Sequence, residues 1–199
     1  MSKTVWLKEI NNHLIQRIRE KVELENKDVT TVFAYPESLS EEISLETLNL
    51  PKIVVTDYDI LPDYPALSLN YGLYEEVGGD DNEVIIKEYP KPYWVYYRFT
   101  VMAEYYEDLF DVLEQLFITF PERTYLQVPD KSGTPVELFM ERVEAPRPSN
   151  TEGMPDKTNN EIRQRRVLLR EMKYKIASEI EDGEERTYRR VQSHNVDTD

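Results

Sequence analysis

Residues 93–105 constrain the fold of this chain more than any other segment, because an extended strand of this sequence is apolar on both faces. Odd-numbered positions from 93 to 103 carry Tyr, Val, Tyr, Phe, Val and Ala, while the even-numbered positions include Trp, Tyr and Met. Successive side chains of a strand point to opposite faces of its sheet, and apolar residues on both faces are typical of a buried strand. We therefore expect residues 93–105 to lie centrally in a sheet.

Two further segments have the apolar periodicity of amphipathic helices that face a core. The first runs from Thr4 to about Leu24, with Thr4 or Ser2 as its expected cap. The second begins with Asp108 as its expected cap and ends at Pro121, because proline cannot continue a helix. Their apolar positions are Trp6, Ile10, Leu14, Ile18 and Val22 in the first, and Leu109, Val112, Leu113, Leu116, Phe117 and Phe120 in the second.

Shorter β-branched and aromatic runs predict additional strands. The strand at 83–89 is expected to pair with the residues that follow it, and Asp130-Lys131-Ser132-Gly133 is a predicted turn. The predicted strands are residues 29–35, 51–56, 66–74, 83–89, 124–128 and 136–143.

The last fifth of the chain differs from the rest in charge. The whole chain has 39 acidic and 24 basic residues, a formal net charge of −15, whereas residues 161–199 hold nine of each sign, so the entire excess of negative charge lies before residue 161. Residues 145–160 contain three prolines and no periodicity, which is typical of a linker. Residues 168–180 fit either a helix or one strand of a hairpin, and the turn signal Asp182-Gly183 favours the hairpin, with 186–191 as the return strand.

These patterns predict a domain at 1–145, a linker or long loop at 146–162, and a C-terminal hairpin arm with a flexible tail at 163–199. A run of like charge is usually a solvated face. Here the acidic body of another copy of the chain supplies a complementary surface, so we predict that the arm is an inter-subunit or neck contact. The alternative is a hairpin that completes its own sheet. The candidate interface residues are Arg163, Arg165, Arg166, Arg170, Lys173, Lys175, Arg186, Arg189 and Arg190.

Few residues could support catalysis or hold a cofactor. The chain has no cysteine and two histidines, His13 and His194, which leaves too few ligands for a zinc site. It contains neither a glycine-rich phosphate-binding motif nor a G-x-S-x-G nucleophile motif. The sequence thus predicts no enzyme and no cofactor. The longest apolar runs have four or five residues, far below the roughly 20 that span a bilayer, so we expect no membrane contact.

Two weaker alternatives remain from the residues themselves. Asp57, Asp59 and Asp63, together with Asp80 and Asp81, could hold Mg²⁺ for phosphodiester cleavage, although acidic clusters are expected throughout a chain of this charge. The aromatic strand at 93–105 could stack nucleic-acid bases, but it has few basic neighbours, so core packing is the better interpretation.

The order of the predicted elements resembles that of the tail terminator (tail-completion) proteins of tailed bacteriophages. The resemblance covers residues 5–145 and rests on the first helix, the strands at 29–35 and 51–55, and the strand 93–105 that runs directly into the helix 108–120. It implies an α+β fold, a mixed or mainly antiparallel sheet with two amphipathic helices on one face, to which this chain adds a C-terminal β-hairpin extension. Residues 146–199 depart from the compact family pattern.

The resemblance also implies a structural virion protein without catalytic residues. Such proteins form hexameric rings at the head-proximal end of the tail, stop the growth of the tail tube or sheath, and dock it to the neck. The expected partners are other copies of the chain, a tail tube or sheath protein and a neck or head-completion protein, while genomic DNA passes through the lumen without specific binding. The expected location is the tail–neck junction of the virion, after assembly in the host cytoplasm.

Two other function classes stay open. The nearest is another neck, collar or baseplate structural protein, which the sequence does not separate from a tail terminator. The more distant one is an acidic DNA mimic that inhibits a DNA-binding enzyme.

Overall fold

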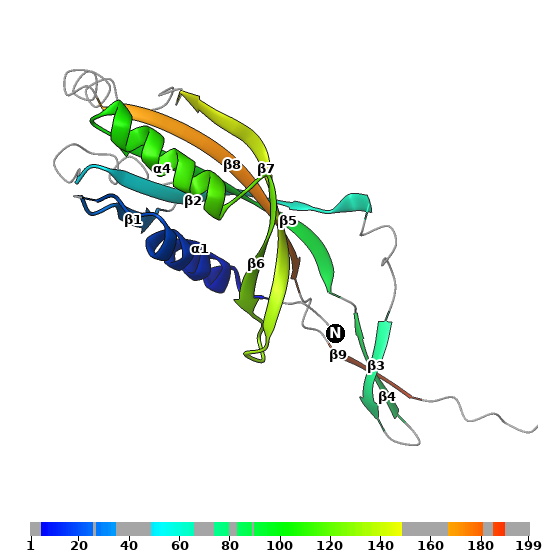
Figure 1. Cartoon of the computed structure of the whole chain (residues 1–199). Helices are drawn as coiled ribbons and strands as arrows, with labels where there is room; N and C mark the ends of the chain where they lie inside the picture. The colour runs from blue at the N-terminus through cyan, green and yellow to red at the C-terminus, as the bar shows by residue number, and fades with distance from the viewer. Residues whose placement is uncertain are drawn as a thin grey trace, which may run out of the picture.

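A six-stranded mixed sheet forms the centre of the computed structural model (Figure 1), which describes residues 5–25, 27–34, 49–65, 74–79, 83–88, 90–148, 167–180 and 185–189. The strand order is β1-β2-β5-β8-β7-β6, in which β1 is parallel to β2 and every other neighbouring pair is antiparallel. The α+β class with a mixed sheet is therefore confirmed. The strands are β1 (Thr30–Phe33), β2 (Lys52–Pro62), β5 (Lys91–Ala103), β6 (Arg123–Pro129), β7 (Pro135–Pro148) and β8 (Leu168–Ile180).

β5 occupies the central position that its sequence predicted. It pairs with β2 along one edge and with β8 along the other, and Phe99 lies between Val55 and Met172 in register. Val95, Tyr97, Phe99 and Val101 are fully buried on the face that the helices cover. On the opposite face Trp94 and Tyr96 are half-buried. The apolar residues on both faces thus have different environments, one inside the core and one on a partly open surface.

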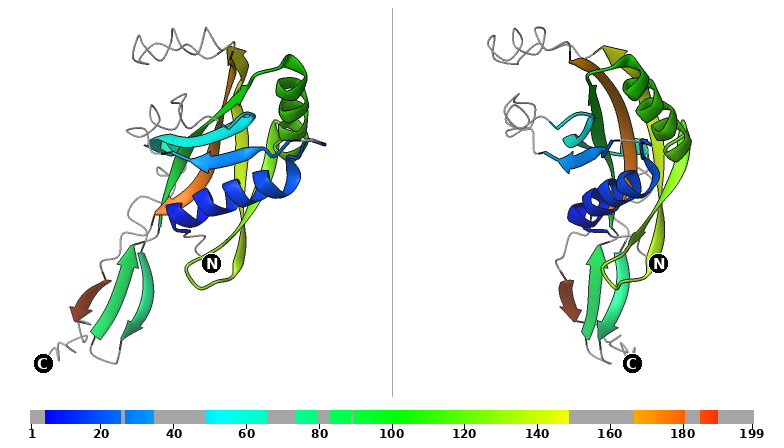
Figure 2. Two further views of the ribbon diagram at one scale, coloured as in Figure 1. Left: turned by 90° about the vertical axis from the view of Figure 1, so that its left-hand side faces the viewer. Right: turned by 60° about the vertical axis from the view of Figure 1, so that its left-hand side comes forward.

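Two helices, α1 (Leu7–Lys21) and α4 (Tyr106–Thr119), lie on the same side of the sheet (Figure 2), as expected. The residue before each helix is Trp6 or Tyr105, and neither side chain caps it. The prediction that Asp108 caps the second helix is wrong. Asp108 instead lies in the first turn, where a negative charge is favourable beside the positive end of the helix dipole. Ser2 and Thr4 lie outside the described residues.

The sheet curls so that α1 contacts both of its edge strands, β1 and β6. Two arginines of α1 fasten these contacts. The Arg19 guanidinium donates a hydrogen bond to the Thr31 carbonyl of β1 at 2.8 Å, and the Arg17 guanidinium donates to the Tyr125 carbonyl of β6 at 3.0 Å. An edge carbonyl that accepts a side-chain hydrogen bond is less available to a foreign strand. α1 therefore partly closes the open mouth of the curled sheet.

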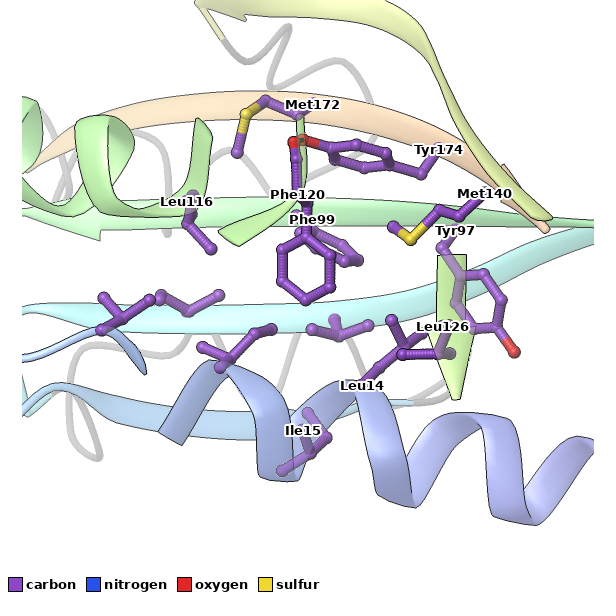
Figure 3. Packing of buried hydrophobic residues seen from close by; sticks show 14 of the residues in the cluster. Leu14, Ile15, Tyr97, Phe99, Leu116, Phe120, Leu126, Met140, Met172 and Tyr174 are labelled. Atoms are coloured by element: carbon purple, nitrogen blue, oxygen red, sulfur yellow. Dashed lines mark hydrogen bonds between the residues drawn. The ribbon is translucent and has the colours of Figure 1, made fainter. Parts of the chain in front are cut away.

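Three aromatic residues from different elements meet in the core (Figure 3). The ring centroids of Phe99 and Tyr174 are 4.9 Å apart, and those of Phe99 and Phe120 are 5.5 Å apart in an edge-to-face arrangement. The Tyr174 hydroxyl donates to the Phe120 carbonyl at 3.0 Å, which satisfies the polar end of a fully buried side chain. Burial raises the pKa of Tyr174 to about 12. These contacts join β5, β8 and the end of α4 into one core.

β8 overturns the predicted separation of a C-terminal arm from the body. Residues 168–180 form a strand, as the hairpin interpretation required, but it lies between β5 and β7 inside the main sheet. Its alternate residues Met172, Tyr174 and Ile176 are fully buried under the helices. The arm prediction is therefore wrong for residues 168–180. β7 also extends to Pro148, so the first residues of the predicted linker belong to a strand, and residues 149–166 lie outside the described ones.

A smaller three-stranded antiparallel sheet extends beyond one end of the main sheet (Figure 1). It consists of β3 (Tyr74–Gly79), β4 (Glu83–Glu88) and β9 (Glu185–Arg189), in the order β3-β4-β9. The prediction that the strand at 83–89 pairs with the residues after it is wrong, because β4 pairs with β3 and β9. The predicted return strand thus joins β4 instead of β8, and its turn at 181–184 and the tail at 190–199 lie outside the described residues.

The turn between β6 and β7 follows its sequence. Asp130 accepts hydrogen bonds from the backbone amides of Ser132 and Thr134, and Gly133 adopts a φ of 83°, which glycine reaches without a steric penalty. Among the residues that the structure describes, no helix has the length and apolar character needed to cross a bilayer.

Candidate interaction surfaces

The face of the main sheet opposite the helices, which we call the outer face, combines aromatic rings with cations. The Tyr58 ring lies 5.9 Å from the Tyr96 ring, and the Arg98 guanidinium lies 5.3 Å from the Tyr58 centroid. The Lys175 ammonium lies 4.4 Å from the Trp94 centroid on the same face. Contacts of this kind are worth roughly 0.5–1 kcal/mol at exposed sites. The aromatic residues of β2 and β5 are therefore already partnered within the chain.

Two of the predicted interface lysines form ion pairs on this outer face. Lys173 lies 3.1 Å from a carboxylate oxygen of Glu144, and Lys175 lies 2.9 Å from one of Glu141. The pKa of Glu141 is lowered, chiefly because Lys175 is hydrogen-bonded to its carboxylate. These pairs explain the basic stripe of β8 inside one subunit, where it balances the acidic residues of β7. Lys173 and Lys175 consequently lose the argument that assigned them to another subunit.

The other predicted interface residues divide into three groups. Arg170 lies half-buried near the start of β8, and its guanidinium donates to the Leu169 carbonyl at 2.8 Å. Arg186 and Arg189 belong to β9, where they pair in register with Ile86 and Glu83. The remaining four lie outside the described residues: Arg163, Arg165, Arg166 and Arg190. The structure thus brings the nine candidates into no single cluster among the residues it describes.

The acidic residues of β2 do not converge on a metal site. Asp57 is half-buried near the Tyr97 phenol, whose pKa is raised first by burial and then by the Asp57 charge. Asp59 is exposed and accepts a hydrogen bond from the backbone amide of Ile60. Within the described ranges no group of three or more His, Asp or Glu side chains is arranged to hold a metal ion. Asp80, Asp81 and His194 lie outside those ranges.

Grooves run along both sides of α1. One, of about 820 Å³, lies between α1 and the β1–β2 edge, and the Tyr97 hydroxyl donates there to the Asn11 side chain at 2.7 Å. The other, of about 430 Å³, lies between α1 and β6 and is lined by His13, Arg17 and Glu137 among others. His13 is half-buried, in agreement with the interpretation that it is not a metal ligand. Both grooves are lined mainly by mixed polar side chains.

The outward side of α4 is the most apolar exposed surface of the described residues. Tyr105, Tyr106, Phe110 and Ile118 have exposed fractions of 57, 58, 59 and 74%, and the rings of Tyr106 and Phe110 stack at 6.1 Å. Exposed acidic residues lie among them, and the helix contains no basic residue. We call this surface the α4 face, and it consists of Glu104, Tyr105, Tyr106, Glu107, Phe110, Asp111, Glu114 and Ile118.

Sequence analysis missed the α4 face because it asked only which residues of the helix form the core. The signal was available. Tyr106, Phe110 and Ile118 lie outside the arc of Leu109, Val112 and Leu116, so a helix of this sequence cannot bury all of its large apolar side chains on one side.

Comparison with models of known protein families and with curated proteins found no match for this chain.

Proposed function

We propose that this chain is a structural virion protein of the tail terminator kind, which caps the head-proximal end of a phage tail tube or sheath as a ring and docks it to the neck. The observation that carries the proposal is the order of elements. A helix, two strands, a long central strand that leads directly into a second helix, and a further strand follow one another within one sheet. Both helices pack on one face of it, which agrees with the resemblance (Figure 2).

The smaller sheet supports a role in assembly. It extends from one end of the main sheet (Figure 1), and β3 and β9 are its outer strands in the described order. A strand at the edge of a sheet presents unpaired backbone groups that pair readily with a strand of another subunit. A projecting sheet with two such edges is suited to join neighbours in a ring.

The charge of the chain supports passage of DNA through such a ring. A subunit with a net charge of −15 surrounds the lumen with negative potential. Phosphates are then repelled from the walls, so the genome slides without specific binding. The same charge disfavours a nucleic-acid-binding protein, which needs an excess of Lys and Arg on its contact surface.

The test is direct imaging with assembled tails. The chain with a gold-binding tag is added to tail tubes of the phage that encodes it, and the mixture is examined by negative stain. The expected result is a six-subunit ring with label at the head-proximal end of each tube, and tails that join heads only when the chain is present. Label at a collar position or on the baseplate would instead assign the chain to another structural ring, and absence of label from particles would refute a virion role.

A further inference from the structure

We infer that the α4 face is a docking surface for a second copy of this chain, which contacts it with the basic residues Arg163, Arg165 and Arg166. The inference deepens the proposed function, on which it rests for the expectation that copies associate. It assigns the acceptor side of an inter-subunit contact to α4, a surface for which the fold of a single subunit provides no cover in the described residues.

The apolar part of the α4 face is large enough to form the centre of an interface. Tyr106, Phe110 and Ile118 are spaced at multiples of four residues, so they form a stripe along the outward side of the helix. Aromatic side chains offer about 150–250 Å² each, so exposed fractions near 60% leave on the order of 400 Å² of apolar surface in water. A patch of that size is at the upper end for a monomer, and it is about half of what each partner buries in a stable complex.

The polar part of the α4 face selects the charge of the partner. Glu104, Glu107, Asp111 and Glu114 are all exposed, and the helix carries no lysine or arginine to balance them. The first two favour the helix itself, because negative charge is favourable at its N-terminal end. Asp111 and Glu114 lie further along and gain nothing from the helix dipole. A partner that covers the apolar stripe must therefore bring positive charge beside them.

Lys27 shows that this surface binds a cation. Its ammonium is hydrogen-bonded to the Asp108 carboxylate and lies 4.8 Å from the centroid of the Tyr105 ring. The pKa of Lys27 is raised, chiefly by its hydrogen bond with Asp108. One lysine from the end of α1 thus uses an acidic residue together with an aromatic ring at the margin of the α4 face. Tyr106 and Phe110 offer rings of the same kind beside Glu107 and Asp111.

The chain itself supplies the complementary charges. Lys173 and Lys175 are paired with glutamates of β7, and Arg170 is bonded to a backbone carbonyl. Arg163, Arg165 and Arg166 form the remaining dense basic group of the sequence, with Ile162 and Val167 as apolar neighbours. A segment of three arginines flanked by apolar residues matches a surface of acidic and aromatic residues in both respects.

The experiment exchanges charges between the two surfaces. The first variant carries Asp111→Lys with Glu114→Lys, and the second carries Arg163→Glu, Arg165→Glu and Arg166→Glu. Each full-length variant is examined by sedimentation velocity at low salt, alone and as an equal mixture. Each alone is expected to self-associate at least tenfold more weakly than the unaltered chain, because like charges then face each other. The mixture is expected to regain association, since every contact between the two variants joins opposite charges.

The mixture distinguishes a second copy from the same chain. If the arginines contacted α4 within one subunit, each variant would keep its own repulsion and mixing would restore nothing, which would overturn the inference. Glu20→Lys with Glu137→Lys, on the groove between α1 and β6, is the matched control for net charge and is expected to leave association unchanged. An equal loss in this control, or an unaltered chain that stays monomeric at all concentrations, would also overturn it.

Two further measurements complete the test. Phe110→Ser is expected to weaken association even at high salt, where charge contacts are screened beyond about 3 Å, while its far-ultraviolet circular dichroism remains that of the unaltered chain. Unchanged association of this variant would contradict a docked apolar stripe. The proposed function fails separately from the inference, because a chain that associates through α4 but never labels tails refutes only the former. A chain that caps tails regardless of the charge exchange refutes only the latter.

Discussion

Removal of residues 161–199 from the chain tests the position of β8. The shortened chain lacks the strand between β5 and β7, including the buried side chains of Leu169, Met172, Tyr174 and Ile176. Full burial of one such side chain contributes about 1.5–3 kcal/mol, so the four together contribute about 6–12 kcal/mol. The whole free energy of unfolding of a domain is about 5–15 kcal/mol. The central strands would also keep unpaired backbone groups. We therefore expect the 1–160 chain to be unfolded.

Far-ultraviolet circular dichroism and thermal unfolding measure this outcome, with a chain that ends at Ile180 as the control. The control retains β8 and loses β9, so its main sheet is expected to unfold cooperatively. Single substitutions refine the test. Met172→Ala removes a fully buried side chain and is expected to cost about 2–5 kcal/mol, whereas Lys173→Ala, on the opposite face of the same strand, is expected to cost about 1 kcal/mol or less. A 1–160 chain with a native spectrum and a cooperative transition would refute the placement of β8.

Three further predictions concern single groups. Tyr174→Phe is expected to reduce the loss of stability between pH 10 and 12, measured as the thermal midpoint against pH: the pKa of Tyr174 is raised to about 12 by burial, so the folded state is favoured below the ordinary value near 10 and loses that advantage as the pH rises to 12, and an unchanged profile would contradict this. Thr100→Val is expected to raise the free energy of unfolding by about 1 kcal/mol in urea titrations, because the Thr100 hydroxyl is buried without a hydrogen-bond partner in the described part of the chain, and a loss of stability would show that the hydroxyl is satisfied in solution. The purified chain is expected to leave DNA intact with Mg²⁺, and cleavage that disappears in Asp57→Asn would overturn the non-enzymatic proposal.

Much of the local structure is written in short stretches of sequence. The central strand β5 was predictable because Val95, Tyr97 and Phe99 alternate with apolar residues that also need cover, which is a property of thirteen consecutive residues. The helices were predictable for a similar reason, since periodic apolar residues define one buried side. Their exact starts were not predictable, because Trp6 and Tyr105 precede the helices without the capping side chains that mark a start.

The candidate surfaces were only partly predictable. The basic stripe of β8 was visible in the sequence, but the glutamates that balance Lys173 and Lys175 belong to β7, and only strand pairing brings them within ion-pair distance. Charge alone therefore suggested an external partner where an internal one exists. The α4 face was visible as apolar residues in excess of one helix side, yet its exposure depends on the absence of a covering element among the described residues.

The amino-acid sequence by itself thus determined which segments are helices and strands and which side of each one is apolar, because these preferences arise from neighbouring residues. Only the tertiary structure decided that β8 lies between β5 and β7 and that β9 joins β4. The physical reason is that strands pair through backbone hydrogen bonds, which are the same for every residue except proline, so an alternating strand is compatible with many partners. Its place is selected by the burial of Met172, Tyr174 and Ile176 against residues that are distant in the chain.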